Sequence, residues 1–421
     1  MNPTRPEVEV VGEVYNFRWP DAGVQIIVDR FSQDMRAQTV TAELAVSLDP
    51  RIHPDITSKH LHHARLNLTA SRSKNELAKV IQERRNSVDW QTIVEQVSVI
   101  ALQRYRQGEP VVSIGNTPID QDRPTYQLYP ILRKDQPTII FGRGGLGKSL
   151  LGGFFSLLIQ SGIDMEGFRP EKANVLYLDY EDDSGETNDR LQAFKAGIGS
   201  GVRGTEVLYR YCHQPLHYDA GALQRIKAEH DIGMVVVDSL GGATAGQVND
   251  PEVNTKAFNT LRALKVTSLI IDHVSKADDG KGPIGSVFKY NRARSVWEVK
   301  SAQQPGEEET NLGLYHRKVN RGKLLRPFGL RMEFVGDDPT TAILTSSVKV
   351  EDVPELEIEL PLAERIWAIL AGQALTSEEV WQAVNTGEGA GRASLETVRV
   401  TLSRNNPRFI HAEGHWERLI Q

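Results

Sequence analysis

The chain has 421 residues, a net charge of −6 and 39% hydrophobic residues, a composition typical of a globular protein with two or three domains. No apolar run is long enough to span a bilayer and the N-terminus lacks the apolar core of a signal peptide, so we expect a cytoplasmic protein without a membrane partner. The single cysteine, Cys212, excludes an internal disulfide framework, and the mild acidity argues against a surface coated with nucleic-acid-binding charge but allows a local basic groove.

The first region combines predicted strands with predicted helices. Apolar and polar residues alternate over residues 8–48, as expected for strands of a half-solvated sheet. From Leu61 to Arg106 the pattern turns helical, with Ser73 as an N-cap and a second, more apolar helix in "WQTIVEQVSVIALQRYR". We therefore predict an N-terminal α+β domain over residues 1–115.

A histidine-rich stretch, "KHLHHAR", lies inside this region. His60, His62 and His63 have no carboxylate or cysteine at ligand spacing, so we interpret them as a partly exposed segment rather than a metal site. The domain could be an oligomerisation collar, a DNA-binding module or a partner-docking element.

The second region, residues 124–350, alternates short apolar strands with helices. The strand candidates are continuous and rich in β-branched residues, which is typical of a parallel sheet covered on both faces. They are "TIIF", "NVLYLDY", "GMVVVDSL" and "SLIIDH". The later segments "SVWEVK" and "NLGLYHRKV" predict an added antiparallel meander.

The acidic, proline-bearing residues 351–361 are interpreted as a linker to a third domain, residues 362–421. Three short helices are expected there, the third capped by Ser394, followed by a hairpin with Gly414 near its tip. Three helices and a two-stranded wing are the pattern of a winged helix.

A phosphate-binding motif stands between two apolar runs in "TIIFGRGGLGKSLLGGFF". Gly142, Gly147, Lys148 and Ser149 fit G-x-x-x-x-G-K-[ST], placed after a strand and before a helix. The glycines let backbone N–H groups curl around phosphate oxygens, the lysine supplies charge and the serine hydroxyl suits Mg²⁺. The residues expected to bind ATP are Gly142, Gly144, Gly145, Leu146, Gly147, Lys148, Ser149 and Leu150.

Two acidic strand ends complete the predicted hydrolytic site. Asp238 follows four apolar residues in the manner of a Walker B strand, and we expect it to complete the Mg²⁺ shell with Ser149. Glu181, after "VLYLDY", is our candidate for the base that activates water, while Asp183 or Ser184 suits the N-cap of the next helix.

These motifs, with "SLIIDHVSK" after the Walker B strand, resemble the RecA-like ATPases over about residues 124–335. The resemblance is to the RepA-type plasmid helicases and the related AAA-25 ATPases. It implies an α/β fold with a RecA-like P-loop core and a mostly parallel sheet, flanked here by the N-terminal domain and the winged helix. It also implies that Glu181 activates water and that His273 senses the γ-phosphate. Lys318 and Arg321 match loosely the basic pair that reaches a neighbouring subunit's nucleotide, which implies a hexameric ring.

Nucleic-acid contacts are expected in two places. The loop after His273 faces the channel in RecA-like rings, and here it interleaves cations with Phe288 and Tyr290, which suits a single strand. Its candidate residues are Lys276, Lys281, Lys289 and Arg292. The third C-terminal helix carries Arg399 and Arg404 and could enter duplex DNA, although such domains also bind proteins.

The sequence therefore predicts an ATP- and Mg²⁺-dependent DNA motor, a helicase of plasmid, phage or mobile-element replication. The alternative is a nucleotide-switched DNA-binding or scaffold protein that does not unwind. A small-molecule kinase is a third reading, which the second acidic strand end and the "DHVSK" strand disfavour.

Overall fold

The computed structural model describes residues 5–11, 14–34, 36–108, 111, 113–116, 124–165, 167–246, 249–274, 287–303, 306–336, 339–386, 393–404 and 408–419. The chain divides into two compact units: residues 1–123 with 214–231 and 259–264 form one, and the remainder forms the other. In the part of the chain covered by these ranges, no helix is both long and apolar enough to cross a membrane.

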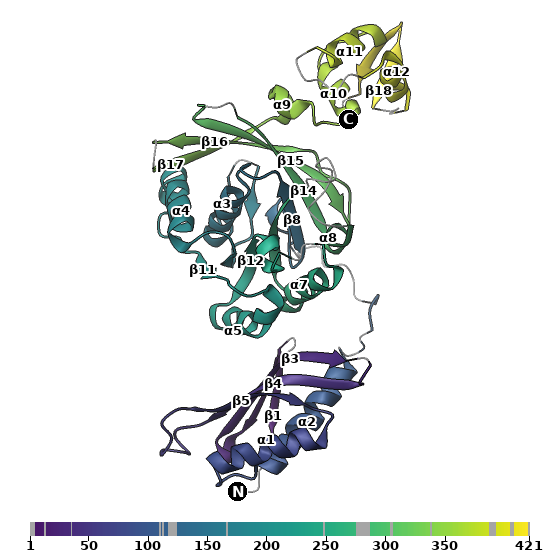
Figure 1. The fold of residues 1–421 in the computed structure, drawn as a ribbon. Coiled ribbons are helices and arrows are strands. Elements are labelled where there is room, and N and C mark those ends of the chain that lie inside the picture. Colours follow the sequence, from purple (N-terminus) through teal and green to yellow (C-terminus); the bar gives the residue numbers. More distant parts are fainter. Residues whose placement is uncertain are drawn as a thin grey trace. The chain divides into compact units, whose positions relative to one another are not determined.

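The N-terminal part is an antiparallel meander followed by two helices (Figure 1). Burial alternates along the strands, and the buried side chains pack with Trp90, Ile93 and Val97 of the second helix. The elements are β1 (Glu7–Val11), β2 (Val14–Trp19), β3 (Val24–Asp34), β4 (Thr39–Leu48), β5 (His60–Asn67), α1 (Ser71–Arg84) and α2 (Trp90–Gln107).

Two expectations for this part were wrong. The stretch from His60 to Asn67 is strand β5, paired with β4, because its residues complete the sheet edge rather than a helix. Helix α1 begins at Ser71, and Ser73 accepts a hydrogen bond from the Asn67 amide instead of capping the helix. His63 lies 3.6 Å from the Glu43 carboxylate.

The central sheet has nine strands in the order β11-β10-β12-β13-β8-β14-β15-β16-β17. The first six are parallel, so their carboxyl ends share one edge. These strands are β11 (Leu208–Tyr211), β10 (Asn174–Asp179), β12 (Ile232–Asp238), β13 (Thr267–His273), β8 (Pro137–Gly142) and β14 (Ser295–Ala302). Strand β13 separates β8 from β12, as the RecA-like fold requires.

The antiparallel extension continues from β14 through β15 (Glu309–Val319), β16 (Phe328–Val335) and β17 (Ala342–Val348). The meander was predicted, but β14 itself is parallel to β8. Side chains of the extension share one apolar core with α3 (Lys148–Ser161) and α4 (Ser184–Ile198), which pack beside the sheet in Figure 1.

The remaining elements between residues 124 and 292 are short or lie between strands in the sequence. A small sheet has the order β7-β6-β9, with β6 (Tyr126–Tyr129) as its central strand. The other elements are β7 (Leu132–Arg133), β9 (Arg169–Pro170), α5 (Ala220–His230), α6 (Leu240–Ala243), α7 (Pro251–Leu264) and α8 (Val287–Arg292).

The loop between β15 and β16 is anchored by a buried histidine. The Leu325 amide donates to Nδ1 of His316 at 3.0 Å, so Nε2 carries the proton and faces the Ser295 hydroxyl at 3.1 Å. The His316 ring also stacks on Trp297, with ring centroids 4.2 Å apart. Burial, reinforced by Arg133, lowers the pKa of His316 to about 4.

This anchor predicts a loss of stability in mild acid. The unfolded chain takes up a proton at His316 near pH 6.5 whereas the folded chain resists it down to about pH 4, so stability falls as the pH drops through that window. We expect about 2 kcal/mol of loss between pH 7 and pH 5 from this residue. Urea midpoints at the two pH values would measure it in wild type and in His316→Gln, which keeps a donor and an acceptor but does not titrate. Equal pH dependence in both proteins would contradict the assignment.

Residues 351–361 are not a simple linker. They contain a short helix, α9 (Pro354–Glu357), and pack Val353, Leu356 and Leu360 around Tyr315. The Tyr315 hydroxyl donates to the Leu356 carbonyl at 2.6 Å.

The C-terminal part has the predicted order of three helices and a hairpin. Ser394 accepts a hydrogen bond from the Thr397 amide at 3.1 Å, which confirms it as the cap of the third helix, and Gly414 has a positive φ of 86° at the hairpin turn. A common core joins the helices to Phe409. The elements are α10 (Leu362–Ile369), α11 (Ser377–Val384), α12 (Leu395–Arg404), β18 (Phe409–Ala412) and β19 (His415–Arg418).

Candidate active site

The predicted phosphate loop joins strand β8 to helix α3. Gly145 and Gly147 adopt positive φ angles of 77° and 80°, which an L side chain rarely accepts. A Cβ on Gly144 or Gly145 would point into open space, so the loop presents bare backbone. The N-terminus of a 14-residue helix follows directly at Lys148 and adds unpaired N–H groups and partial positive charge. The loop therefore forms an anion-binding cradle.

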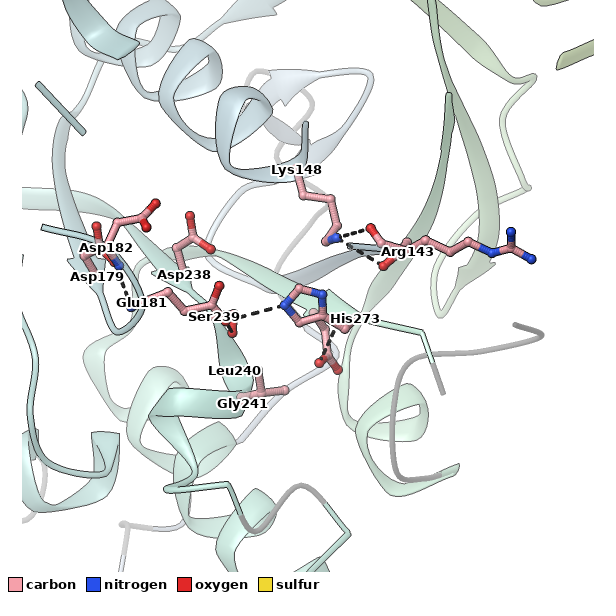
Figure 2. A network of polar contacts seen from close by, with 12 residues as sticks. Arg143, Lys148, Asp179, Glu181, Asp182, Asp238, Ser239, Leu240, Gly241 and His273 are labelled. Atoms are coloured by element: carbon pink, nitrogen blue, oxygen red, sulfur yellow. Dashed lines mark hydrogen bonds and ion pairs between the residues drawn. The ribbon is translucent and has the colours of Figure 1, made fainter. Parts of the chain in front are cut away.

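Lys148 is held inside this cradle rather than in solvent. Its ammonium donates to the carbonyl of Gly142 at 3.1 Å and to that of Arg143 at 2.6 Å (Figure 2). Burial lowers the pKa of Lys148, while the carboxylates of Asp238 and Glu181 oppose that shift. The ammonium thus stands between the loop and two acids.

Asp238 ends strand β12 at the same sheet edge. The Tyr177 hydroxyl donates to its Oδ2 at 2.6 Å, and its Oδ1 is buried without a hydrogen-bond partner among the residues that the structure describes. Burial raises the pKa of Asp238, whereas the hydrogen bond from Tyr177 and the nearby Ser149 hydroxyl lower it. A buried carboxylate oxygen beside a serine hydroxyl is a donor set that suits Mg²⁺ and its water shell, so Ser149 and Asp238 fit that ion.

Glu181 lies at the centre of a polar network beside this edge. The Ser239 hydroxyl donates to its Oε1, and Nε2 of His273 lies 3.4 Å from the same oxygen. The hydrogen bond from His273 is the main reason that the pKa of Glu181 is lowered, with Ser239 adding to it. Figure 2 shows the three side chains converging, with Asp238 and Lys148 on the same side. The Glu181 carboxylate is therefore held by two neighbouring side chains.

A second acid, Asp179, fixes the turn that carries Glu181. Its Oδ1 accepts from the amides of Glu181 and Asp182 at 3.0 and 2.9 Å, and its Oδ2 accepts from Thr187. Asp182 turns away and pairs with Arg190 at 2.6 Å. Asp183 is the N-cap of α4, as one of the two predicted alternatives had it. Tyr177, Asp179 and Ser239 were not among the predicted site residues, since their partners are distant in sequence or carry no motif.

The acid that precedes His273, Asp272, is buried in the protein interior. Asp272 and Lys289 form a buried ion pair with N–O distance 3.2 Å, and their side chains are 2% and 0% exposed. Lys289 is therefore not available to phosphate in this structure, which argues against its predicted contact with DNA. Lys276 and Lys281 lie outside the described residues, and Arg292 closes helix α8.

The predicted basic pair is divided between two roles. Lys318 donates to the carbonyls of Tyr290, Asn291 and Ala293, so it caps α8 from strand β15 rather than pointing outward. Arg321 is exposed on the loop between β15 and β16. Of these two residues, Arg321 is the one exposed enough to contact a neighbouring subunit.

The two arginines of α12 also differ. Arg399 forms an ion pair with Glu378 of α11, whereas Arg404 is exposed in the last turn of the helix. The exposed face of α12 also includes Glu396 and Val400. This helix is therefore mixed in charge.

The parallel sheet, the P-loop and the acids at the neighbouring strand ends are arranged as in a RecA-like P-loop fold. A family model described as an AAA domain, AAA_25, matches residues 109–279. No curated protein matches the sequence. Similar solved structures include a KaiC-like protein from Pyrococcus horikoshii OT3, with 12% identity and a TM-score of 0.37 over 54% of this chain and all of that one. Another is the flagellar accessory protein FlaH from Methanocaldococcus jannaschii, with 13% identity and a TM-score of 0.35 over 51% of this chain and 90% of that one.

Proposed function

We propose that this chain is an ATP-driven DNA motor, a ring-forming helicase of the RepA-like type that acts in the replication of a plasmid, phage or mobile element. The observation that carries the proposal is the Glu181–Ser239–His273 network beside the P-loop. This network brings a carboxylate, a hydroxyl and an imidazole together at the carboxyl ends of the three neighbouring strands β10, β12 and β13, which supports a hydrolytic site.

ATP would be held by the P-loop amides and by Lys148, with its γ-phosphate toward Glu181 and His273. A Mg²⁺ ion held by Ser149 and Asp238 would supply neutralisation of the phosphate charge. Glu181 would orient a water molecule and take its proton. His273, which contacts Glu181 and follows the buried Asp272–Lys289 pair, would report the state of the phosphate to helix α8.

The assembly we propose is a homohexamer in which Arg321 of one chain reaches the nucleotide of the next. Such an arginine stabilises the charge that develops on the γ-phosphate and makes hydrolysis depend on assembly. Single-stranded DNA in the channel and duplex DNA at a C-terminal winged helix would be the nucleic-acid partners, with Arg292 and Arg404 as remaining candidates.

A second function is favoured by one observation. Lys289 is buried and Arg399 is paired with Glu378, so fewer cations are free for DNA than the sequence indicates. This favours a nucleotide-switched scaffold, in which ATP controls assembly and no strand separation occurs.

A fork-substrate unwinding assay separates the two functions. We expect wild type to unwind with ATP, and Arg321→Ala and Lys148→Ala each to lose roughly tenfold or more in rate. Mixing the two variants should restore part of the activity, since a site with intact Lys148 can then meet an intact Arg321. Arg326→Ala, an exposed arginine in the same loop, is the matched control and should stay close to wild type. DNA-stimulated ATP hydrolysis without strand separation would support the scaffold, and a mixture as inactive as its components would remove the trans-acting role of Arg321.

A further inference from the structure

Tyr177 reaches the predicted metal-binding acid from within the apolar core. It lies on β10, only 2% exposed, and is paired in register with Val236 of β12, two residues before Asp238. The length of the phenol spans this offset, and its hydroxyl donates to Oδ2 of Asp238 at 2.6 Å. Burial and the neighbouring carboxylates raise the pKa of Tyr177 well above its ordinary value, so the hydroxyl remains a donor.

The two oxygens of Asp238 have different surroundings. Oδ2 is engaged by Tyr177, while Oδ1 is buried and accepts no hydrogen bond within the described part of the chain. A buried acceptor left unpaired costs free energy, which a ligand shell at that oxygen would recover. The phenol therefore occupies one oxygen of Asp238 and leaves the other for a further partner.

A glycine in helix α3 makes room for this contact. A Cβ on Gly152 would lie 3.2 Å from the Tyr177 hydroxyl and 3.0 Å from Cδ1 of Ile271, both tighter than ordinary packing. A Cβ on the next residue, Gly153, would meet only Cδ2 of Leu191 at 3.5 Å. Glycine in a helix interior is unfavourable by about 1 kcal/mol relative to alanine. Of these two glycines, Gly152 is the one that is needed to leave space for the Tyr177 ring.

We propose that Tyr177, seated against Gly152, is a positioning residue that orients Asp238 so that Oδ1 faces the divalent-cation shell at Ser149. The proposal rests on the proposed binding of ATP with Mg²⁺. It concerns the cation rather than the phosphates, because among the described residues the Tyr177 hydroxyl donates to Asp238, while Lys148 donates to the carbonyls of Gly142 and Arg143.

The test is to titrate Mg²⁺ while following the binding of a fluorescent ATP analogue to the full-length chain. We expect Tyr177→Phe to raise the Mg²⁺ concentration needed for half-maximal binding by about tenfold, as the loss of a hydrogen bond that orients a metal ligand does. Affinity for the analogue in EDTA should stay within about twofold, because the phosphate cradle is intact.

Two glycine variants keep the proposal testable if the tyrosine variant folds poorly. Gly152→Ala displaces the hydroxyl without removing it and should shift the Mg²⁺ titration in the same direction. Gly153→Ala adds the same methyl group one residue later and should leave the titration unchanged. An unchanged titration in Tyr177→Phe or in Gly152→Ala, or equal losses with Mg²⁺ and in EDTA, would overturn the positioning role. A wild-type chain that binds no ATP under either condition would instead overturn the proposed function.

Discussion

Lys148→Ala should reduce the affinity for ATP by about 100-fold and the rate of hydrolysis by roughly 10³-fold, the larger of the two effects being on the chemical step. Lys148 is 4% exposed, and its ammonium donates to the loop carbonyls near the acids Asp238 and Glu181, where a phosphate chain would displace the carbonyls as its partners. Charge-assisted hydrogen bonds in such a desolvated site are stronger than those at a surface, and alanine leaves no replacement.

The measurement is the binding of a fluorescent ATP analogue together with phosphate release. Lys172→Ala, an exposed lysine outside the loop, is the matched control and should behave as wild type in both assays. The variant also loses two hydrogen bonds that tie the loop to its own helix, so thermal midpoints should be recorded alongside. Nucleotide affinity that survives the substitution in a folded chain would show that the glycine loop is not the phosphate site.

Local motifs carried most of what could be predicted. Strand β8, the loop and helix α3 follow from a contiguous spacing in which each residue type has one geometric task, and the structure places Lys148 and Ser149 at the helix start accordingly. The same holds for the acid at the end of β12 and for the caps Asp183 and Ser394, since capping is a contact over two or three residues.

Contacts between distant residues could not be predicted in this way. Strand β5 has an irregular, histidine-rich pattern, and only its pairing with β4 reveals it. Lys289 lies in a segment rich in basic and aromatic residues, which predicts exposure to solvent. In the structure its ammonium is buried and donates to Asp272, which is 17 residues away. In the sequence, Tyr177 is indistinguishable from the apolar residues of its strand. Its function as a hydrogen-bond donor depends on Asp238, which lies on the neighbouring strand and is 61 residues away. In each case the environment of a polar group is set by tertiary packing.

The same reasoning applies to the predicted basic pair at the end of β15, Lys318 and Arg321. Lys318 and Arg321 are equivalent in sequence terms, because both are cations near a turn. The structure distinguishes them, since the carbonyl end of α8 captures Lys318 and leaves Arg321 exposed. An ammonium group that donates hydrogen bonds to the carbonyls at a helix end cannot at the same time contact a neighbouring subunit.

Glu181→Gln should leave ATP binding intact while slowing hydrolysis by roughly 10²- to 10⁴-fold. The amide keeps the size of the side chain but cannot take a proton from water. Its orientation should persist, because the backbone amide of Glu181 is held by Asp179 at 3.0 Å and Ser239 can still donate to the remaining oxygen. Binding of the ATP analogue and single-turnover phosphate release would separate the two effects.

The neighbouring acid supplies the control, and the pH profile supplies an independent readout. Asp182→Asn removes the same charge one residue away, but that side chain pairs with Arg190, so hydrolysis should fall by less than about threefold. Because hydrogen bonds from His273 and Ser239 lower the pKa of Glu181, the base stays ionised throughout the neutral range, and its protonation should reduce the rate only below the ordinary range of a glutamate. If Asp182→Asn abolished hydrolysis while Glu181→Gln preserved it, the catalytic base would have to be reassigned within the turn, since the two carboxylates bind different partners.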